Sequence, residues 1–299
     1  MLPTSQPLIS TLSTPARADF SGLWIPLVTP FRGGNVDLAA LQRLTGHLKS
    51  TGIAGFVVCG STGEAAALDE DEQLAVLDTV LASAGGLPVM MGVGGDNQAR
   101  AVRFAGLLNQ RPLAALLVAP PAYIRPSQAG LLQWFGAIAD ASRAPIVVYD
   151  IPYRTGVALA LETLLTLAAD ARFQGIKDCG GDTLKTQALI ADGRLQVLAG
   201  EDAQIFSTVA LGGRGAIAAS AHVRTESFVA VLQALAEARL EAARQAWQPL
   251  LPLIETLFAE PNPAPVKALL GQQGWMSQEL RSPMTPASAS LAQRLAAWA

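Results

Sequence analysis

The sequence predicts an α/β protein that folds as a (β/α)8, or TIM, barrel with a C-terminal helical extension. Eight short apolar runs, each bounded by glycine or proline, recur between residues 22 and 219. Segments of helical length separate these runs, and the strand signal ends after Ala221. Continuous apolar runs are typical of parallel strands that are buried on both faces. Eight repeats of strand and helix favour a closed barrel over a doubly wound open sheet.

Each expected strand is four to six residues long and rich in Val, Ile, Leu and Ala. No dinucleotide-binding fingerprint of a Rossmann-type open sheet follows the first strand. The glycine-rich stretch 92–95 also lacks the later glycine and the acidic residue of such a loop. The eight runs are residues 23–28, 55–58, 88–93, 114–119, 145–149, 174–177, 196–199 and 215–219.

The segments between the strands carry helix start signals and helical spacing. Asp37 is a suitable N-cap, and leucines follow it at helical intervals. Asp69 opens the next helix with three acidic residues in its first turn, where the helix dipole favours negative charge. We expect Leu74, Leu77 and Leu81 to form the buried stripe of this helix. The remaining intervening helices are residues 100–109, 127–142, 161–169, 184–191 and 203–211.

The two ends of the chain differ in character from the barrel. Helices are expected near the C-terminus at residues 237–247, 250–259, 264–270 and 287–298. The first twenty residues are polar and rich in Ser, Thr and Pro, and no basic residue precedes their weak apolar stretch. We therefore interpret them as a disordered or loosely packed arm and not as a signal peptide. The expected division is an arm at 1–20, a barrel catalytic domain at 21–238 and a helical region at 239–299.

Composition and charge exclude several classes of function. The chain has 299 residues, is 51% hydrophobic and carries a net charge of −3 without a basic run, so no nucleic-acid partner is expected. Its apolar stretches are shorter than the roughly 18 residues of a membrane span, so no membrane partner is expected. Two cysteines without a CxxC pattern and two histidines without paired spacing predict neither a disulfide framework nor a metal site. These features predict a soluble protein of a reducing compartment, the cytoplasm.

Lys177 is one of only four lysines, and it ends the apolar run 173–177 directly before the turn 178–181. An ammonium at the end of a buried strand is costly unless it is paired or neutralised. A desolvated amine loses its proton more easily, and a free amine can attack a ketone to form a Schiff base. The alternative is a strand-end lysine whose stem is buried and whose ammonium reaches water.

Distinctive polar residues follow three other expected strands, at the barrel end where active sites lie. The turn at residues 60–64 places two adjacent hydroxyls, Ser61 and Thr62, among glycines, and its N–H groups can hold a carboxylate. All three tyrosines of the chain lie in two of these loops: Tyr123 follows the fourth strand, and Tyr149 and Tyr153 lie at the end of the fifth. Tyrosines that only fill a core are not expected to concentrate in this way.

With these residues in place, the chain resembles the pyruvate-dependent class I aldolases typified by dihydrodipicolinate synthase and N-acetylneuraminate lyase. The resemblance covers about residues 20–271 and rests on several motifs in the order of the family. It implies a Schiff base on lysine without a separate cofactor, and a homotetramer built from tight dimers. The motifs are residues 29–31 (Thr-Pro-Phe), 60–64, the proline-rich loop around Tyr123, 149–156, 175–177 (Gly-Ile-Lys), 199–203 and 262–267.

The resemblance also implies a role for each matching residue. Lys177 matches the lysine that forms an imine with pyruvate, and Tyr149 matches the tyrosine that relays protons to and from this imine. Thr62 matches a threonine that links this tyrosine to a second tyrosine, Tyr123, which family members supply from a neighbouring subunit. The positions that match residues around the bound pyruvate are Ser61, Thr62, Gly200 and Ile217.

Arg154 distinguishes members of this family from one another. It matches an arginine that binds the carboxylate of aspartate semialdehyde in the synthases and that sialic acid lyases usually lack. The expected function is therefore a lyase of lysine biosynthesis that condenses pyruvate with an aldehyde, namely aspartate semialdehyde.

Other positions keep alternatives open. Synthases usually have threonine at the position of Ser61 and tyrosine at that of Ala122. An aldolase or dehydratase for 2-keto-3-deoxy sugar acids or N-acetylneuraminate is one alternative. A catalytically silent barrel that binds a small acid is the other. Glu70, Gln73 and Arg100 replace residues that help bind lysine in lysine-inhibited synthases, so no lysine feedback is expected.

Overall fold

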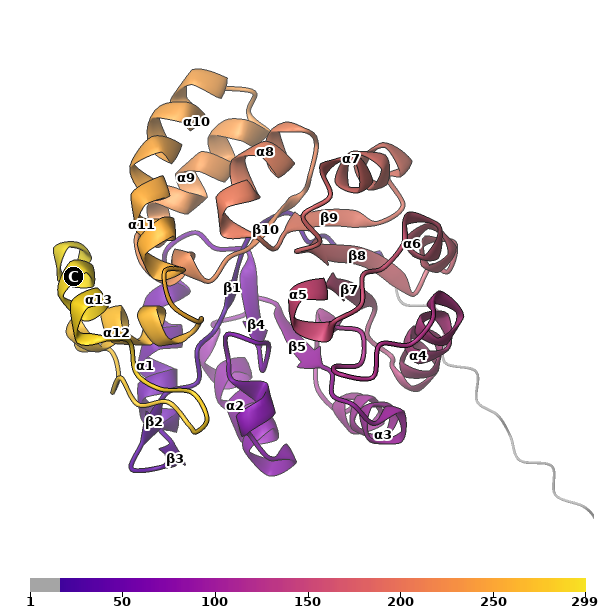
Figure 1. The fold of residues 1–299 in the computed structure, drawn as a ribbon, viewed down its shortest axis with the longest axis horizontal. Coiled ribbons are helices and arrows are strands. Elements are labelled where there is room, and N and C mark those ends of the chain that lie inside the picture. The colour runs from indigo at the N-terminus through magenta and orange to yellow at the C-terminus, as the bar shows by residue number, and fades with distance from the viewer. Residues whose placement is uncertain (1–16) are drawn as a thin grey trace, which may run out of the picture.

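The computed structural model describes residues 17–299, so residues 1–16 of the expected arm lie outside the described residues. In this part of the chain, eight parallel strands close into a barrel in the order β1-β10-β9-β8-β7-β6-β5-β4 (Figure 1). The predicted (β/α)8 barrel is confirmed, and the sheet is not open. The strands are β1 (Gly22–Pro26), β4 (Gly55–Val58), β5 (Val89–Val93), β6 (Ala115–Val118), β7 (Ile146–Asp150), β8 (Phe173–Asp178), β9 (Gln196–Ala199) and β10 (Gly215–Ile217).

All eight expected runs form strands, with small differences at their ends. The first run is expected to reach Val28, but β1 ends at Pro26. The Val28 N–H donates to the His222 Nε2 at 3.2 Å, so a side chain replaces the neighbouring strand as its partner. β8 is longer than expected at both ends and includes Asp178, which is in register with Asp150 of β7. The residue that follows Lys177 is therefore still part of the barrel wall.

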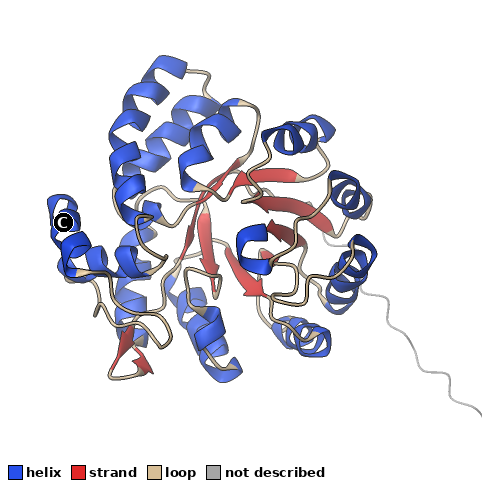
Figure 2. Cartoon of the chain, viewed as in Figure 1, coloured by secondary structure: helices blue, strands red, loops and turns tan. Residues whose placement is uncertain are grey.

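Helices follow the strands and cover the outside of the barrel (Figure 2). The expected N-caps are present: the Asp37 side chain accepts from the Ala40 N–H, and Asp69 forms a capping box with Glu72. No helix within residues 17–299 is long and apolar enough to cross a membrane. The helices are α1 (Leu38–Leu48), α2 (Glu70–Ser83), α3 (Gln98–Leu108), α4 (Gln128–Ala141), α6 (Leu161–Ala168), α7 (Thr183–Asp192), α8 (Ile205–Ala210) and α9 (Thr225–Ala236).

The buried face of α2 differs from the expected stripe of leucines. Leu77 is buried as expected, but Val76 and Val80 are buried with it, whereas Leu74 and Leu81 are only partly buried. The helix packs against β4 and β5 of the barrel and also against α1. Because it contacts two kinds of neighbour, its buried face is rotated away from the single row of leucines.

Several elements in the structure are missing from the sequence prediction. They are α9, the hairpin of β2 (Phe31–Arg32) and β3 (Asn35–Val36), and the short helix α5 (Pro152–Thr155). The chain turns after α9, where Ala238 takes a φ of +57°, so the helix expected at 237–247 begins later, at Leu240. The C-terminal helices are α10 (Leu240–Trp247), α11 (Leu251–Leu257), α12 (Ala264–Gln272) and α13 (Ala289–Leu295).

Aromatic side chains close the barrel at its N-terminal end. Phe20 is fully buried, and its ring meets the Trp24 ring edge-on with the centroids 6.1 Å apart. The Phe20 N–H donates to the Gln196 side chain at 2.9 Å, which ties the segment before β1 to the start of β9. Residues 18–20 are therefore held against the barrel, unlike the loose packing expected for the end of the arm.

Candidate active site

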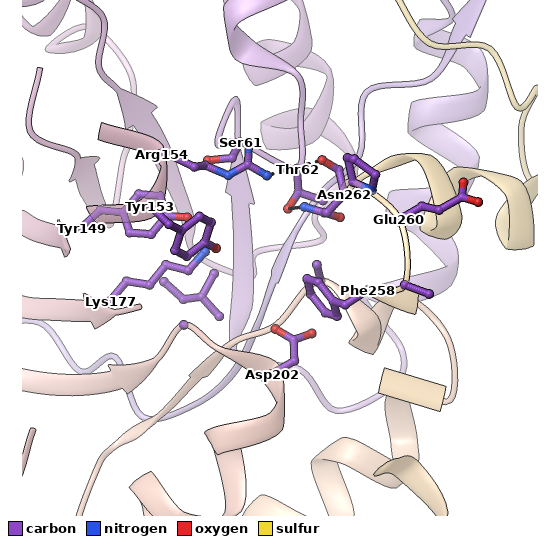
Figure 3. Close-up of a pocket in the computed structure, with 15 residues that line it drawn as sticks. Ser61, Thr62, Tyr149, Tyr153, Arg154, Lys177, Asp202, Phe258, Glu260 and Asn262 are labelled. Atoms are coloured by element: carbon purple, nitrogen blue, oxygen red, sulfur yellow. Dashed lines mark hydrogen bonds between the residues drawn. The ribbon is translucent and has the colours of Figure 1, made fainter. Parts of the chain in front are cut away.

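A pocket of about 350 Å³ lies among the loops that follow the barrel strands (Figure 3). Its walls come from the turn after β4, the segment after β7, the ends of β8, β9 and β10, and a loop of the C-terminal region. Tyr123 does not line it. The other seven residues expected at the site all do, and they are Ser61, Thr62, Tyr149, Arg154, Lys177, Gly200 and Ile217.

Lys177 lies near the end of β8 and is only 7% exposed. Its Nζ is 4.4 Å from the centroid of the Tyr149 ring. The other two buried lysines, Lys185 and Lys267, each contact a carboxylate oxygen, at 2.6 and 2.5 Å. Within residues 17–299, no carboxylate forms an ion pair with Lys177. An amine without such a partner is available to react with a carbonyl group in the pocket.

Tyr149 stands next to Lys177 because the two residues are register partners on the neighbouring strands β7 and β8. Burial raises the pKa of the Tyr149 phenol well above its ordinary value, and a hydrogen bond with Ser61 and the charge of Arg154 oppose this only in part. The phenol is therefore protonated at neutral pH. It can donate its proton to a reacting group and take a proton back.

A buried polar cluster holds the ends of β7 and β8 in place. Asp150, which follows Tyr149, is fully buried, and its carboxylate contacts the Lys185 ammonium of α7 at 2.6 Å. Burial raises the pKa of the Asp150 carboxyl, and Lys185 opposes this rise. Asp178, at the end of β8, accepts a hydrogen bond from the Thr186 hydroxyl of the same helix. α7 therefore anchors the ends of the two strands that carry the amine and the phenol.

The turn after β4 presents its hydroxyls to the pocket. Cys59 and Glu64, which bracket the turn, take left-handed φ angles of +51° and +53°. Such angles are uncommon outside glycine, and they reverse the chain sharply. Thr62 is 4% exposed, and its Oγ1 accepts a hydrogen bond from the Asn262 Nδ2 at 2.9 Å. Ser61 lines the pocket beside it, which is the arrangement that a carboxylate clamp requires.

Gly200 lines the pocket at a place where no larger residue fits. A Cβ at this position would lie 2.3 Å from the Cys179 Sγ and 2.9 Å from the Lys177 Cγ. Real side chains do not approach so closely, so any other residue would displace the lysine stem. Ile217, at the end of β10, forms another part of the wall.

Asp202 lines the pocket although it is not among the residues expected from the sequence. It follows β9, is 3% exposed and accepts hydrogen bonds from the Ser220 N–H and hydroxyl. Burial raises the pKa of the Asp202 carboxyl to about 6, and the Ser220 hydrogen bonds oppose this rise. The available signal was an acidic residue three positions after a barrel strand, within the motif at residues 199–203. In the part of the chain that the structure describes, no three His, Cys, Asp or Glu side chains gather as a metal ion would require.

His222, which follows β10, is buried and held as a neutral imidazole. Its Nε2 accepts the Val28 N–H at 3.2 Å, so its Nδ1, which lies 2.8 Å from the Ala219 carbonyl oxygen, carries the proton. Burial lowers the pKa of His222 from 6.5 to about 4.

Replacing His222 with glutamine is expected to make the protein less sensitive to acid. The unfolded chain takes up this proton near pH 6.5 and the folded protein only near pH 4, so stability is lost as the pH falls from 7 toward 4. Between about pH 7 and pH 5 the loss is about 2 kcal/mol. The pKa of Asp202 is raised in the folded protein, so the protonation of Asp202 adds stability as the pH falls. This contribution is the same in the wild type and in the variant. Urea unfolding at the two pH values measures the difference, and equal losses in the two proteins would contradict this assignment.

A loop between α11 and α12 closes the pocket from the C-terminal side. Phe258 and Asn262 line the pocket together with residues 259–261, and Figure 3 shows Asn262 next to Thr62. Residues 262–267 carry one of the motifs on which the resemblance rests, but no side chain of this loop was expected at the site. Helical periodicity does not indicate which loop folds over a barrel.

Arg154 reaches the pocket from α5, the short helix after β7. Its guanidinium lies 5.9 Å from the centroid of the Tyr153 ring, and its Nη2 donates to the Asn262 carbonyl oxygen at 3.4 Å. No carboxylate among residues 17–299 forms an ion pair with Arg154. The guanidinium is therefore available to a carboxylate on a ligand.

Tyr123 is 93% exposed and lies outside the pocket of its own chain. Tyr123 and Arg125 take left-handed φ angles of +70° and +52°. Two such residues in one short loop store backbone strain, which often marks a functional segment. A phenol presented in this way can contact another molecule.

Comparison with known proteins identifies the family of this chain. The model of the Dihydrodipicolinate synthetase family matches residues 19–299. The 4-hydroxy-tetrahydrodipicolinate synthase 2 of Clostridium acetobutylicum is 37% identical over 278 residues, which cover 92% of this chain and 97% of that protein. The crystal structure of dihydrodipicolinate synthase from Aquifex aeolicus has a TM-score of 0.90 at 29% identity and covers 93% of this chain and 96% of its own. A monomeric dihydrodipicolinate synthase variant has a TM-score of 0.90 at 31% identity, with coverages of 93% and 95%.

These matches span nearly the whole length of both chains, and the family model covers the barrel, the pocket and the C-terminal loop alike. They agree with the closed barrel. The chain belongs to the dihydrodipicolinate synthetase family.

Proposed function

We propose that this protein is a Schiff-base lyase that condenses pyruvate with aspartate semialdehyde, the reaction of a 4-hydroxy-tetrahydrodipicolinate synthase. One observation carries the proposal: Lys177 is buried in the pocket wall, lacks an ion pair within the described structure and stands beside the protonated phenol of Tyr149. Family membership supports the reaction class.

In the proposed reaction the Lys177 amine attacks the keto carbon of pyruvate, and loss of water leaves an imine. The Tyr149 phenol gives a proton to the departing hydroxyl and recovers one later, with Thr62 as the next hydroxyl in the relay. The protonated imine withdraws electrons, so a proton leaves the methyl group and an enamine forms. The enamine carbon attacks the aldehyde carbon, and the amine of aspartate semialdehyde then displaces Lys177 from the imine.

The pocket offers a separate site for each of the two substrate carboxylates. Ser61 and Thr62, in the turn after β4, fit the carboxylate of pyruvate. Arg154, which is exposed at the rim, fits the carboxylate of aspartate semialdehyde through two parallel hydrogen bonds. Lys177 itself supplies the electron-withdrawing group, so the proposal includes no further cofactor.

We also propose that two copies form a tight dimer in which each Tyr123 enters the pocket of the other copy, and that two dimers form a cytoplasmic homotetramer. The exposed fractions of Tyr123 and Ile124, 93% and 54%, support a contact at this loop. A monomeric variant is among the similar structures, so the fold does not by itself require assembly. Sedimentation velocity measures the assembly independently of activity.

An aldehyde panel tests this function against its alternatives. The purified protein receives pyruvate with aspartate semialdehyde, glyceraldehyde or N-acetylmannosamine, and mass spectrometry follows the products. Aspartate semialdehyde should give a kcat/KM at least about 100-fold above the sugar aldehydes, because a guanidinium placed for a carboxylate is left unpaired by the others. Preference for a sugar aldehyde would favour an aldolase for 2-keto-3-deoxy sugar acids or N-acetylneuraminate. No turnover of any aldehyde would favour a silent barrel that binds a small acid.

Millimolar lysine is expected to leave the activity unchanged. Glu70 pairs with Arg103 at 2.5 Å, and the Gln73 side chain donates to the Ala65 carbonyl oxygen at 3.3 Å. These two residues stand where the resemblance places lysine-binding histidines, and both are engaged within this chain. Initial rates over a range of lysine concentrations measure the effect, and saturable inhibition would contradict the expectation.

A further inference from the structure

The two polar atoms of the Asn262 carboxamide differ, because one has a hydrogen-bond partner and the other has none. Its Nδ2 donates to the Thr62 Oγ1 at 2.9 Å, whereas its Oδ1 is buried without a hydrogen-bond partner in the described part of the chain. A buried acceptor that lacks a partner destabilises the folded state. The orientation of this side chain is therefore explained by its hydrogen bond to Thr62, because the carboxamide does not have hydrogen-bond partners for both of its polar atoms.

Asn262 also connects three parts of the site that are far apart in the sequence. It belongs to the loop before α12, whereas Thr62 belongs to the turn after β4. Arg154, from the helix after β7, donates to the Asn262 carbonyl oxygen at 3.4 Å. Figure 3 shows Asn262 beside Thr62, across the pocket from Lys177. One residue of the C-terminal region therefore contacts a proposed relay hydroxyl and the proposed carboxylate-binding guanidinium.

The same segment contacts the turn after β4 at a second point. Lys267, the fourth residue of α12, contacts the Glu64 carboxylate at 2.5 Å and the Thr29 carbonyl oxygen at 2.9 Å. Both Lys267 and Glu64 are buried. The two contacts, at Thr62 and at Glu64, fix the distance between Asn262 and the turn. The hydrogen bond from Asn262 is thus one of two contacts that hold this segment against the turn.

We propose that Asn262 is a positioning residue that directs the hydroxyl proton of Thr62 toward the reacting groups. This inference rests on the proposed function, in which Thr62 passes protons between Tyr149 and Tyr123. A threonine hydroxyl has a single proton to donate. The Thr62 Oγ1 accepts a hydrogen bond from the Asn262 Nδ2, so the Thr62 hydroxyl does not donate its own proton to Asn262. This proton remains available for a hydrogen bond within the pocket, where Tyr149 also lies.

Two substitutions that keep the branching of the side chain at Cγ separate this role from space filling. Asn262→Asp puts an ionised carboxylate, which only accepts hydrogen bonds, in place of the donor, so the Thr62 hydroxyl would turn its proton toward it. Asn262→Leu removes both the donor and the unpaired acceptor. A residue that only fills space should tolerate aspartate at least as well as leucine. A residue that directs the Thr62 proton should tolerate aspartate less.

The experiment measures kcat, the KM for pyruvate and the thermal unfolding midpoint of the wild type and both variants. Asn35→Asp, the same change at an exposed asparagine of the β2–β3 hairpin, is the control and should behave as the wild type. At about pH 8, kcat should fall about 100-fold in Asn262→Asp and about 10-fold in Asn262→Leu, with the KM changed less than about threefold. The midpoint of Asn262→Leu should equal or exceed that of the wild type, because the unpaired acceptor is gone.

A pH profile adds a readout that a structural role would not move. As the pH falls, protonation of the introduced carboxyl restores a donor to Thr62, so kcat of Asn262→Asp should rise relative to the wild type. The ionisable residues that line the pocket occur in both proteins, so their own titration largely cancels in this ratio: Tyr149, Tyr153, Arg154, Lys177, Asp202 and Glu260.

Three results would overturn the inference. They are an Asn262→Asp variant as active as Asn262→Leu, a ratio that does not change with pH, and losses of kcat that follow losses of thermal stability. If the proposed function is wrong, the wild type itself would form no borohydride-reducible adduct with pyruvate, which is a different result from the three above. The two failures can therefore be told apart.

Discussion

Replacing Lys177 with alanine is expected to lower kcat for the condensation by at least about 10⁴-fold. Lys177 is the one lysine that lines the pocket in the described structure, so its loss removes the covalent route through an imine. Thermal stability should stay equal or rise, because a buried polar group without an ion pair is costly to the folded state. Steady-state kinetics and thermal unfolding of the purified variant measure the two effects.

Two further variants control this prediction. Lys177→Arg keeps the positive charge but cannot form the imine, so it should be as inactive as the alanine variant. Lys49→Ala removes an exposed lysine and should leave the activity unchanged. Activity close to that of the wild type in either Lys177 variant would show that the reaction does not pass through this amine.

Replacing Lys267 with methionine is expected to lower the free energy of unfolding by about 3–5 kcal/mol. Lys267 is fully buried, and its Nζ contacts the Glu64 carboxylate at 2.5 Å and lies 4.3 Å from the centroid of the Phe31 ring. Burial lowers the pKa of Lys267, and the Glu64 carboxylate opposes this fall. Without the lysine, Glu64 keeps a buried negative charge that has lost its counter-charge, and this is the origin of the large effect.

Denaturant unfolding measures this loss, and kcat should fall as well because Glu64 ends the turn that carries Thr62. The double variant Lys267→Met with Glu64→Gln removes both charges and should recover part of the lost stability. Arg111→Ala breaks a more exposed ion pair with Asp78 and should cost much less. Equal losses in Lys267→Met and Arg111→Ala would contradict the role of the buried pair.

The barrel could be predicted because parallel strands buried on both faces leave continuous apolar runs in the sequence. The helix α9 could not, because it packs against β1, α8 and α10 and is therefore apolar on several sides. Its buried Phe228, Val229, Val231 and Leu232 follow one another too closely to show a helical stripe. The buried face of α2 was misplaced for a related reason, since its packing against both α1 and the barrel decides which residues are covered.

The site residues on strand ends could be predicted because a barrel brings the carboxyl ends of its strands to one face. Lys177 and Tyr149 meet for this reason alone. Asn262 and Phe258 could not be placed, because their position depends on how the C-terminal region folds over the barrel, and no local pattern encodes this. The surroundings of Tyr123 depend on a second copy of the chain in the proposed dimer, so the sequence of one copy does not reveal them.

Reduction of a pyruvate complex with borohydride, followed by peptide mass spectrometry, shows most directly whether Lys177 forms the imine. The proposed reaction predicts one adduct, on the peptide that contains Lys177, with the added mass of pyruvic acid less one oxygen atom. It predicts none on the exposed Lys49 or on Lys185 and Lys267, whose amines are held by carboxylates. An unmodified Lys177, or an adduct on another lysine, would contradict the proposed reaction.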